Sequence, residues 1–125
     1  MKKILTTLLI LGATSLVQAD EKYSHFPAIE STNIQAALCN IKSYNQKLLA
    51  ITSKAELTPE DMVKVHELTY TLENAVNFIK ASLEQVSVDL EDVHKASERL
   101  DQKVIKESGE KYLAPTNVIT TKIEC

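Results

Sequence analysis

The sequence predicts an all-α protein, folded as an antiparallel helical hairpin or bundle, and two observations support this fold class. No Gly or Pro occurs from Glu60 to Ser108, whereas a β-fold needs turn residues every ~8–12 positions. Within the same span, apolar residues recur at alternating spacings of three and four, which is the heptad pattern of packed helices. We therefore expect helices through the centre of the chain.

Residues 1–19 have the features of a secretory signal peptide. Met1-Lys2-Lys3 is basic, Ile4 to Ala13 is apolar, and Val17-Gln18-Ala19 ends in the small residue typical of a cleavage site. An apolar run of about ten residues is too short for a transmembrane helix, which needs ~20. We expect cleavage after Ala19, a periplasmic or secreted mature chain, and no membrane insertion after cleavage.

The first helix is expected over about 32–54, after an extended leader over 20–31 that contains Pro27 and shows no periodicity. Thr32 and Gln35 fit a capping box, in which each side chain bonds a free amide of the first turn. Behind them, apolar residues return at helical spacing, including Ile34, Leu38, Ile41 and Leu48.

The strongest helix-start signal is Thr58-Pro59-Glu60-Asp61. Thr58 can cap the first amides, Pro59 gives up no hydrogen bond at the first helical position, and the acidic pair lies at the positive end of the helix dipole. Only about four residues separate this start from the first helix. The two helices should therefore pack antiparallel.

The second helix is expected over about 59–108, along one apolar seam. Two interpretations of this span stay open. One is a single helix, ~75 Å long at 1.5 Å per residue, straight or bent. The other breaks near 86–89, where two β-branched residues lower helix propensity and Ser87 or Asp89 can cap a new start, giving a three-helix bundle. The seam residues are Met62, Val65, Thr69, Leu72, Val76, Ile79, Leu83, Val86, Leu90, Val93, Ser97, Leu100 and Val104.

Ser108-Gly109 is a plausible helix end, because Gly adopts the left-handed conformation of a C-terminal cap. We therefore assign 32–113 to the helical domain and 114–125, which contains Pro115, to a C-terminal tail. This tail is either disordered or laid along the bundle.

The charge balance argues against nucleic acid as a partner. Removing Lys2 and Lys3 from the 14 Lys and Arg residues leaves 12, against 17 Asp and Glu residues, a net charge near −5. No clustered basic patch of the kind that binds phosphates is visible.

The two cysteines, Cys39 and Cys125, would occupy an oxidising compartment after export. An intramolecular disulfide that ties the tail to the first helix, an intermolecular disulfide through Cys125, and free thiols all remain open. A redox catalyst is not expected, because no Cys-x-x-Cys motif is present.

No catalytic, cofactor-binding or metal-binding residue is predicted. His66 and His94 take the same position beside the seam but are 28 residues apart, which is ~42 Å along a straight helix and too far to share a metal ion. The carboxylates fall mostly on the solvated face, whereas catalysis needs them in a partly desolvated pocket. We therefore expect that the protein is not an enzyme.

Two hypotheses on function follow. The preferred one is a non-enzymatic protein that acts through contact with an unknown protein partner or through self-association as a homodimer. Tyr70 and Phe78 lie off the main seam and, with His66 and His94, mark an expected interaction face. The alternative is a helical bundle that binds a ligand, haem or a metal through His66 or His94.

Two blocks of the chain, LTPEDMVKVHELTYTLENA (57–75) and VHKASERLD (93–101), resemble a family of small, exported, functionally uncharacterised helical proteins of Gram-negative bacteria, a domain of unknown function. The resemblance covers roughly 20–113. It implies an exported helical protein without an assigned activity or cofactor, and it transfers no catalytic residue. The tail after Pro115, with Cys125, falls outside the family pattern.

Overall fold

In a computed structural model, which describes residues 27–125, the chain forms three helices and no strand over that range. Helix α1 spans Ile34–Thr52, α2 spans Pro59–Glu98 and α3 spans Gln102–Thr120. The predicted all-α fold is therefore confirmed. The signal peptide expected over 1–19, its cleavage site and the leader residues 20–26 lie outside the described residues.

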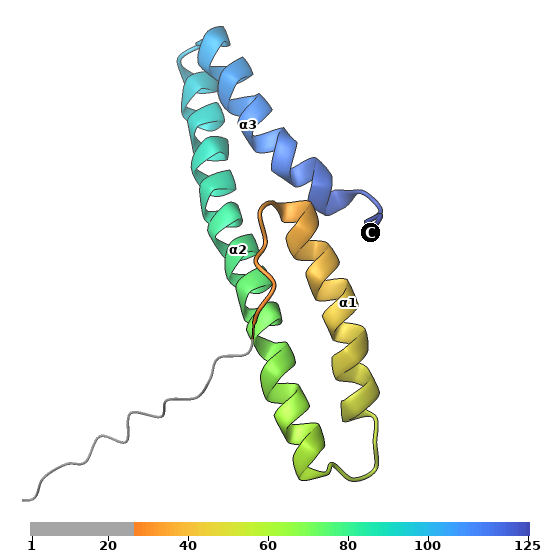
Figure 1. Cartoon of the computed structure of the whole chain (residues 1–125). Helices are drawn as coiled ribbons and strands as arrows, with labels where there is room; N and C mark the ends of the chain where they lie inside the picture. Colours follow the sequence, from red (N-terminus) through yellow and green to blue (C-terminus); the bar gives the residue numbers. More distant parts are fainter. Residues whose placement is uncertain (1–26) are drawn as a thin grey trace, which may run out of the picture.

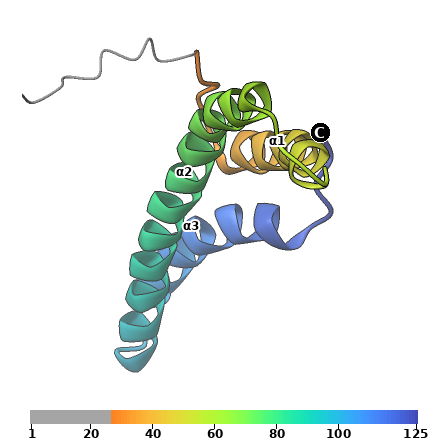
Figure 2. The same ribbon diagram turned by 90° about the horizontal axis from the view of Figure 1, so that it is seen from below.

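Helix α2 is the spine of the molecule, and the other two helices lie end to end along it (Figures 1 and 2). Its 40 residues make a helix ~60 Å long at 1.5 Å per residue. Helix α1 packs against the N-terminal half of α2 and α3 against the C-terminal half, and both run antiparallel to it (Figure 1). The molecule is therefore a rod that is only two helices thick along its length.

The N-terminal cap of helix α1 lies one residue later than predicted. The side chain of Asn33, not of Thr32, accepts a hydrogen bond from the Ala36 amide at 2.8 Å. Gln35 does not return to the cap. Its Nε2 atom donates instead to the carbonyl of Glu124 at 2.6 Å. The predicted capping box at Thr32 is wrong because a neighbouring Asn supplies a better-placed acceptor and the C-terminus recruits the Gln.

The start of α2 is as predicted. Thr58 Oγ1 accepts a hydrogen bond from the Asp61 amide and Asp61 Oδ2 accepts one from the Thr58 amide, both at 3.2 Å, with Pro59 as the first helical residue. All the signals that define this start lie within four residues of each other, so no distant contact is needed to form it.

The structure has the three helices of the second interpretation, but the break lies at residues 99–101 and not near 86–89, because α2 runs without a break through 86–89 and ends at Glu98. Val86 and Asp89 are buried, so tertiary packing outweighs the weak helix propensity there. The turn to α3 uses Leu100 at a φ of 57°. Asp101 then caps α3 by accepting a hydrogen bond from the Val104 amide at 3.2 Å.

The predicted helix end at Ser108-Gly109 and the predicted tail over 114–125 are also wrong, since α3 continues to Thr120. Pro115 lies inside the helix and deprives one carbonyl of its usual amide partner. The Thr116 hydroxyl donates to the Tyr112 carbonyl at 2.8 Å, and Thr120 and Thr121 bond back to the helix in the same way. Only residues 121–125 follow the helix.

The core of the described residues is small. Its buried apolar side chains are Ile34, Ala37, Leu68, Ala75, Val86 and Ala96. The three alanines are fully buried, which lets the helix axes approach closely. A rod two helices thick has no interior layer in which more large side chains can be covered, so many apolar residues of this chain remain at the surface.

Candidate functional site

An exposed row of apolar side chains runs along α2. Met62, Val76, Leu83 and Leu90 occupy one heptad position, and their exposed fractions are 57, 54, 46 and 47%. These four residues are called the exposed stripe below. They belong to the seam that the sequence predicts as the buried face, so half of that seam stays outside the core.

The geometry of α2 explains why the stripe is exposed. Ala75 is fully buried, whereas Val76, the next residue, is more than half exposed. Successive residues of an α-helix lie about 100° apart around its axis. The side of α2 that packs against α1 and α3 therefore contains Leu68, Ala75 and Ala96, and the exposed stripe lies about a quarter turn away from it.

Two shallow grooves accompany the exposed stripe. One has a volume of about 510 Å³ and lies on α2 alone, where its lining is Val76, Ile79, Lys80, Leu83, Glu84 and Ser87. The other, of about 690 Å³, lies between α2 and α3 and includes Leu90, Val93, Ile105 and Leu113. Leu113 is 52% exposed. The apolar surface thus continues from α2 onto α3.

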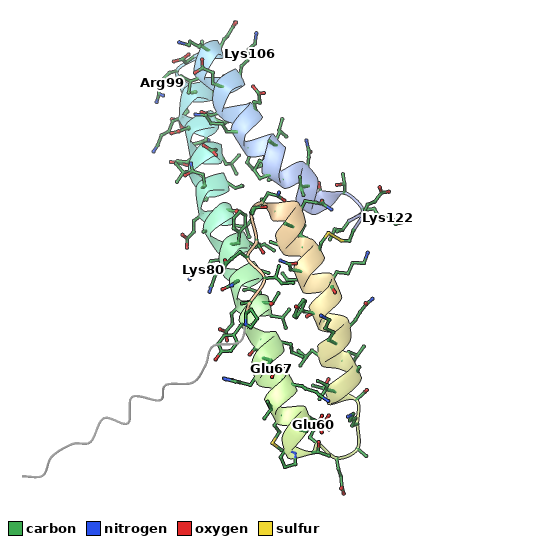
Figure 3. The ribbon with its side chains drawn as sticks, in the orientation of Figure 1. Glu60, Glu67, Lys80, Arg99, Lys106 and Lys122 are labelled. Carbon is green, nitrogen blue, oxygen red and sulfur yellow. A yellow bond between two sulfur atoms is a disulfide. The ribbon has the colours of Figure 1, made fainter. Side chains whose placement is uncertain are left out.

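The charged groups beside the stripe point to solvent. Lys80 projects from α2 on the side away from α1 (Figure 3). Glu84, one turn further along, lines the same groove. This groove therefore combines apolar side chains with one cation and one anion, which is the composition of a helix-docking surface rather than of a catalytic pocket.

The opposite side of α2 is covered by the described end of the leader, residues 27–31. The Ile29 amide donates to Oγ1 of Thr71 at 3.1 Å, and Asn74 Nδ2 donates to Glu30 Oε1 at 2.9 Å. Asn74 and Val76 are two residues apart, or about 200° around the helix. The leader thus shields the side of α2 that the exposed stripe does not occupy.

The structure brings only part of the expected interaction face together. His66 Nε2 lies 3.0 Å from the Tyr70 hydroxyl, with the two rings edge to face at 5.1 Å. Phe78 is half-buried where the three helices meet, in a groove that Pro115 and Val118 also line. His94 lies in the other half of α2 and pairs with Glu98 at 3.4 Å. The four residues therefore form three separate environments.

Within residues 27–125, no group of three His, Cys, Asp or Glu side chains is arranged to hold a metal ion. His66 and His94 lie on one continuous helix, so the expected separation of ~42 Å applies. In the same range no helix is both long and apolar enough to cross a membrane.

A smaller cleft of about 410 Å³ opens between the leader, α1 and α2. Its floor includes Ile51 and Leu68, and Tyr44 forms part of its wall. The ammonium group of Lys47 lies 3.8 Å from the centre of the Tyr44 ring, which is a cation–π contact. This cleft has an apolar base, and its charged lining residues are Lys47, Lys64 and Glu67.

Cys39 and Cys125 form a disulfide with their Cα atoms 5.5 Å apart. Of the three alternatives that the sequence leaves open, the structure has the intramolecular one. The bond joins the first half of α1 to the end of the chain, near Lys122 in Figure 3. It holds the C-terminal end of α3 against the N-terminal end of α1.

These features define a disulfide-linked, all-α protein with an exposed apolar stripe on its longest helix. The chain belongs to a family of unknown function, DUF6746, whose model matches residues 1–121. The comparison with curated proteins and the comparison with solved structures gave no match. The family match extends past Pro115 to residue 121, so the expectation that the family pattern ends near 113 is wrong, whereas Cys125 does lie beyond the match.

Proposed function

We propose that this chain is an exported, non-enzymatic protein that acts by binding an amphipathic α-helix along the exposed stripe of α2. One observation carries the proposal: four large apolar residues repeat every seven or fourteen positions on a helix whose core-facing side is already occupied. A helix with the same spacing can place its own apolar side chains between them.

The energetics favour an interaction of modest strength. Each stripe residue is about half exposed, so its complete burial offers on the order of 1 kcal/mol, and the four together offer on the order of 4 kcal/mol. Association costs offset part of this gain. The grooves around Leu83 and Leu113 add contact area, and the proposal therefore predicts reversible binding rather than a permanent complex.

Export places this contact in the periplasm or outside the cell, and its support is the basic, apolar and small-residue order of residues 1–19. The non-enzymatic character rests on the shape of the molecule. A rod two helices thick offers shallow grooves, and the groove between α2 and α3 is lined mainly by apolar side chains. Catalytic groups need a deeper and more desolvated setting.

Photo-crosslinking in the exporting cell tests the proposal. A photoreactive phenylalanine analogue replaces Leu83 in one variant. In the matched control it replaces Val88, which is apolar and 55% exposed but lies about 140° away around α2. We expect covalent protein adducts from position 83 and few or none from position 88. Equal yields from both positions, or no adduct from position 83, would exclude the exposed stripe as the binding surface.

A further inference from the structure

We propose that the helix bound by the exposed stripe is α2 of a second copy of this chain, paired antiparallel about a two-fold axis at Leu83. This inference rests on the proposed function and names its partner. Three features support this pairing: the symmetry of residues 69–97 at this heptad position, the charges beside the stripe, and the positions of α1 and α3.

The residues at this heptad position are symmetric about Leu83. Val76 and Leu90 lie seven residues to either side, and Thr69 and Ser97 lie fourteen to either side. Antiparallel pairing then sets Leu83 against its own copy, Val76 against Leu90, and Thr69 against Ser97. Each layer contains side chains of one kind, apolar in the middle and small hydroxyls at the ends.

The two hydroxyl residues do not oppose this burial. Thr69 Oγ1 donates to the His66 carbonyl at 2.8 Å, and Ser97 Oγ donates to the His94 carbonyl at 2.6 Å. Both hydroxyls are therefore satisfied within α2, and the pairing leaves no new polar group without a partner.

The charges at the centre are also self-complementary. With the axis at Leu83, Lys80 lies at the level of residue 86 of the second copy. Glu84 of that copy is two residues away from this level, an offset of about 3 Å along the helix axis. A lysine side chain is long enough to cover this offset. By symmetry Glu84 faces the Lys80 of the second copy, so two ion pairs flank the central leucines, on the groove that both residues line.

The antiparallel arrangement also completes the bundle. Helix α1 covers the N-terminal half of α2 and α3 covers the C-terminal half (Figure 1). Reversing the second copy places its α3 beside α1 of the first, on the same side of the paired α2 helices. Each level of the dimer then holds four helices, with every neighbour antiparallel, which is the common four-helix bundle arrangement. The groove between α2 and α3 is covered in this arrangement.

Cysteine cross-linking tests the pairing on the full exported chain with its native disulfide in place. Leu83→Cys should give a covalent dimer on mild oxidation. Val76→Cys alone and Leu90→Cys alone should not, because each residue would lie ~21 Å from its own copy, and a disulfide needs Cα atoms within about 7 Å. An equal mixture of the two variants should cross-link. Val88→Cys is the matched control and should stay monomeric.

Each of the other outcomes would overturn a specific part of the proposed pairing. Self-cross-linking of Val76→Cys and of Leu90→Cys, with no cross-link between the two variants in their mixture, would mean parallel pairing. A monomeric mass in sedimentation at high concentration, together with no cross-link from Leu83→Cys, would exclude a second copy as the partner. In that case the proposed function survives only if photo-crosslinking at position 83 gives an adduct with a different protein. Without such an adduct, the proposed function and the pairing are both excluded.

Discussion

The ammonium nitrogen of Lys54, in the turn between α1 and α2, lies 2.7 Å from Oδ1 of Asp61, a residue that is only 4% exposed. The same carboxylate accepts a hydrogen bond from the Thr58 amide through its other oxygen. One side chain thus joins the turn, the helix cap and the ion pair. The hydrogen bond from Lys54, and after it that from the Thr58 amide, lowers the pKa of Asp61 from 3.8 to about 2.

This lowered pKa predicts a defined acid sensitivity. A carboxyl group whose pKa is lower in the folded than in the unfolded chain stabilises the fold above the unfolded value and loses that effect as pH falls through the folded value. The contribution of Asp61 should therefore be constant above about pH 4 and disappear between about pH 4 and 2. Thermal unfolding of the protein and of Asp61→Asn should show a difference in Tm that closes over this range, and a constant difference would contradict the ion pair.

The contrast between Ala75 and Val76 predicts opposite responses to mutation at adjacent positions. Ala75→Leu forces a large side chain between closely packed helices and should lower the free energy of unfolding by about 1–3 kcal/mol. Val76→Ala removes an exposed side chain and should change it by less than about 0.5 kcal/mol at concentrations where the protein is monomeric. Urea unfolding of both variants checks this. Similar losses in the free energy of unfolding would mean that Val76, like Ala75, lies on the packed side of α2.

Leu100 is predicted to be a residue whose replacement by Gly stabilises the protein. Its φ is 57° and its side chain is 85% exposed, so the left-handed backbone costs roughly 1–2 kcal/mol with little packing in return. Leu100→Gly should raise the free energy of unfolding by about 1 kcal/mol. Leu100→Ala is the control, because it removes the same side chain but keeps the β-carbon, and it should give no such gain.

The disulfide predicts a large loss of stability on its removal, because 86 residues separate Cys39 from Cys125. Closing a loop of that size restricts the unfolded chain, and loss of such a bond costs about 2–5 kcal/mol. Cys39→Ser, Cys125→Ser and the double variant should all lose the same amount in urea unfolding. A double variant clearly less stable than either single one would mean that the cysteines act separately.

Export predicts a defined mature chain. The protein recovered from outside the cytoplasm should have the mass of residues 20–125 with Cys39 and Cys125 oxidised, and its N-terminal residue should be Asp20. Replacing Ala19 with a large residue should hinder cleavage, since the peptidase needs a small side chain there. Intact mass spectrometry distinguishes the two forms, and a mature protein that retains Met1 would contradict the signal peptide.

Local signals in the sequence predicted the parts of the fold that depend on nearby residues. The α2 start at Thr58, Pro59 and Asp61 follows from side chains within one turn, and the antiparallel course of α1 and α2 follows from the short connection between them. The end of α2 could not be predicted in this way. Arg99, Leu100 and Asp101 contain no Gly or Pro, and the turn requires an exposed leucine to accept an unfavourable backbone conformation.

The exposed stripe shows most clearly what the sequence determined and what the tertiary structure decided. The heptad spacing of Met62, Val76, Leu83 and Leu90 was evident from the sequence, since helical periodicity is a property of the chain itself. Which side of α2 would be covered was not, because α1 and α3 pack about 100° away from the stripe, where Ala75 and Ala96 allow the closest approach. The sequence by itself thus determined an amphipathic helix, and only the packing of its neighbours decided which apolar residues remain available to a partner.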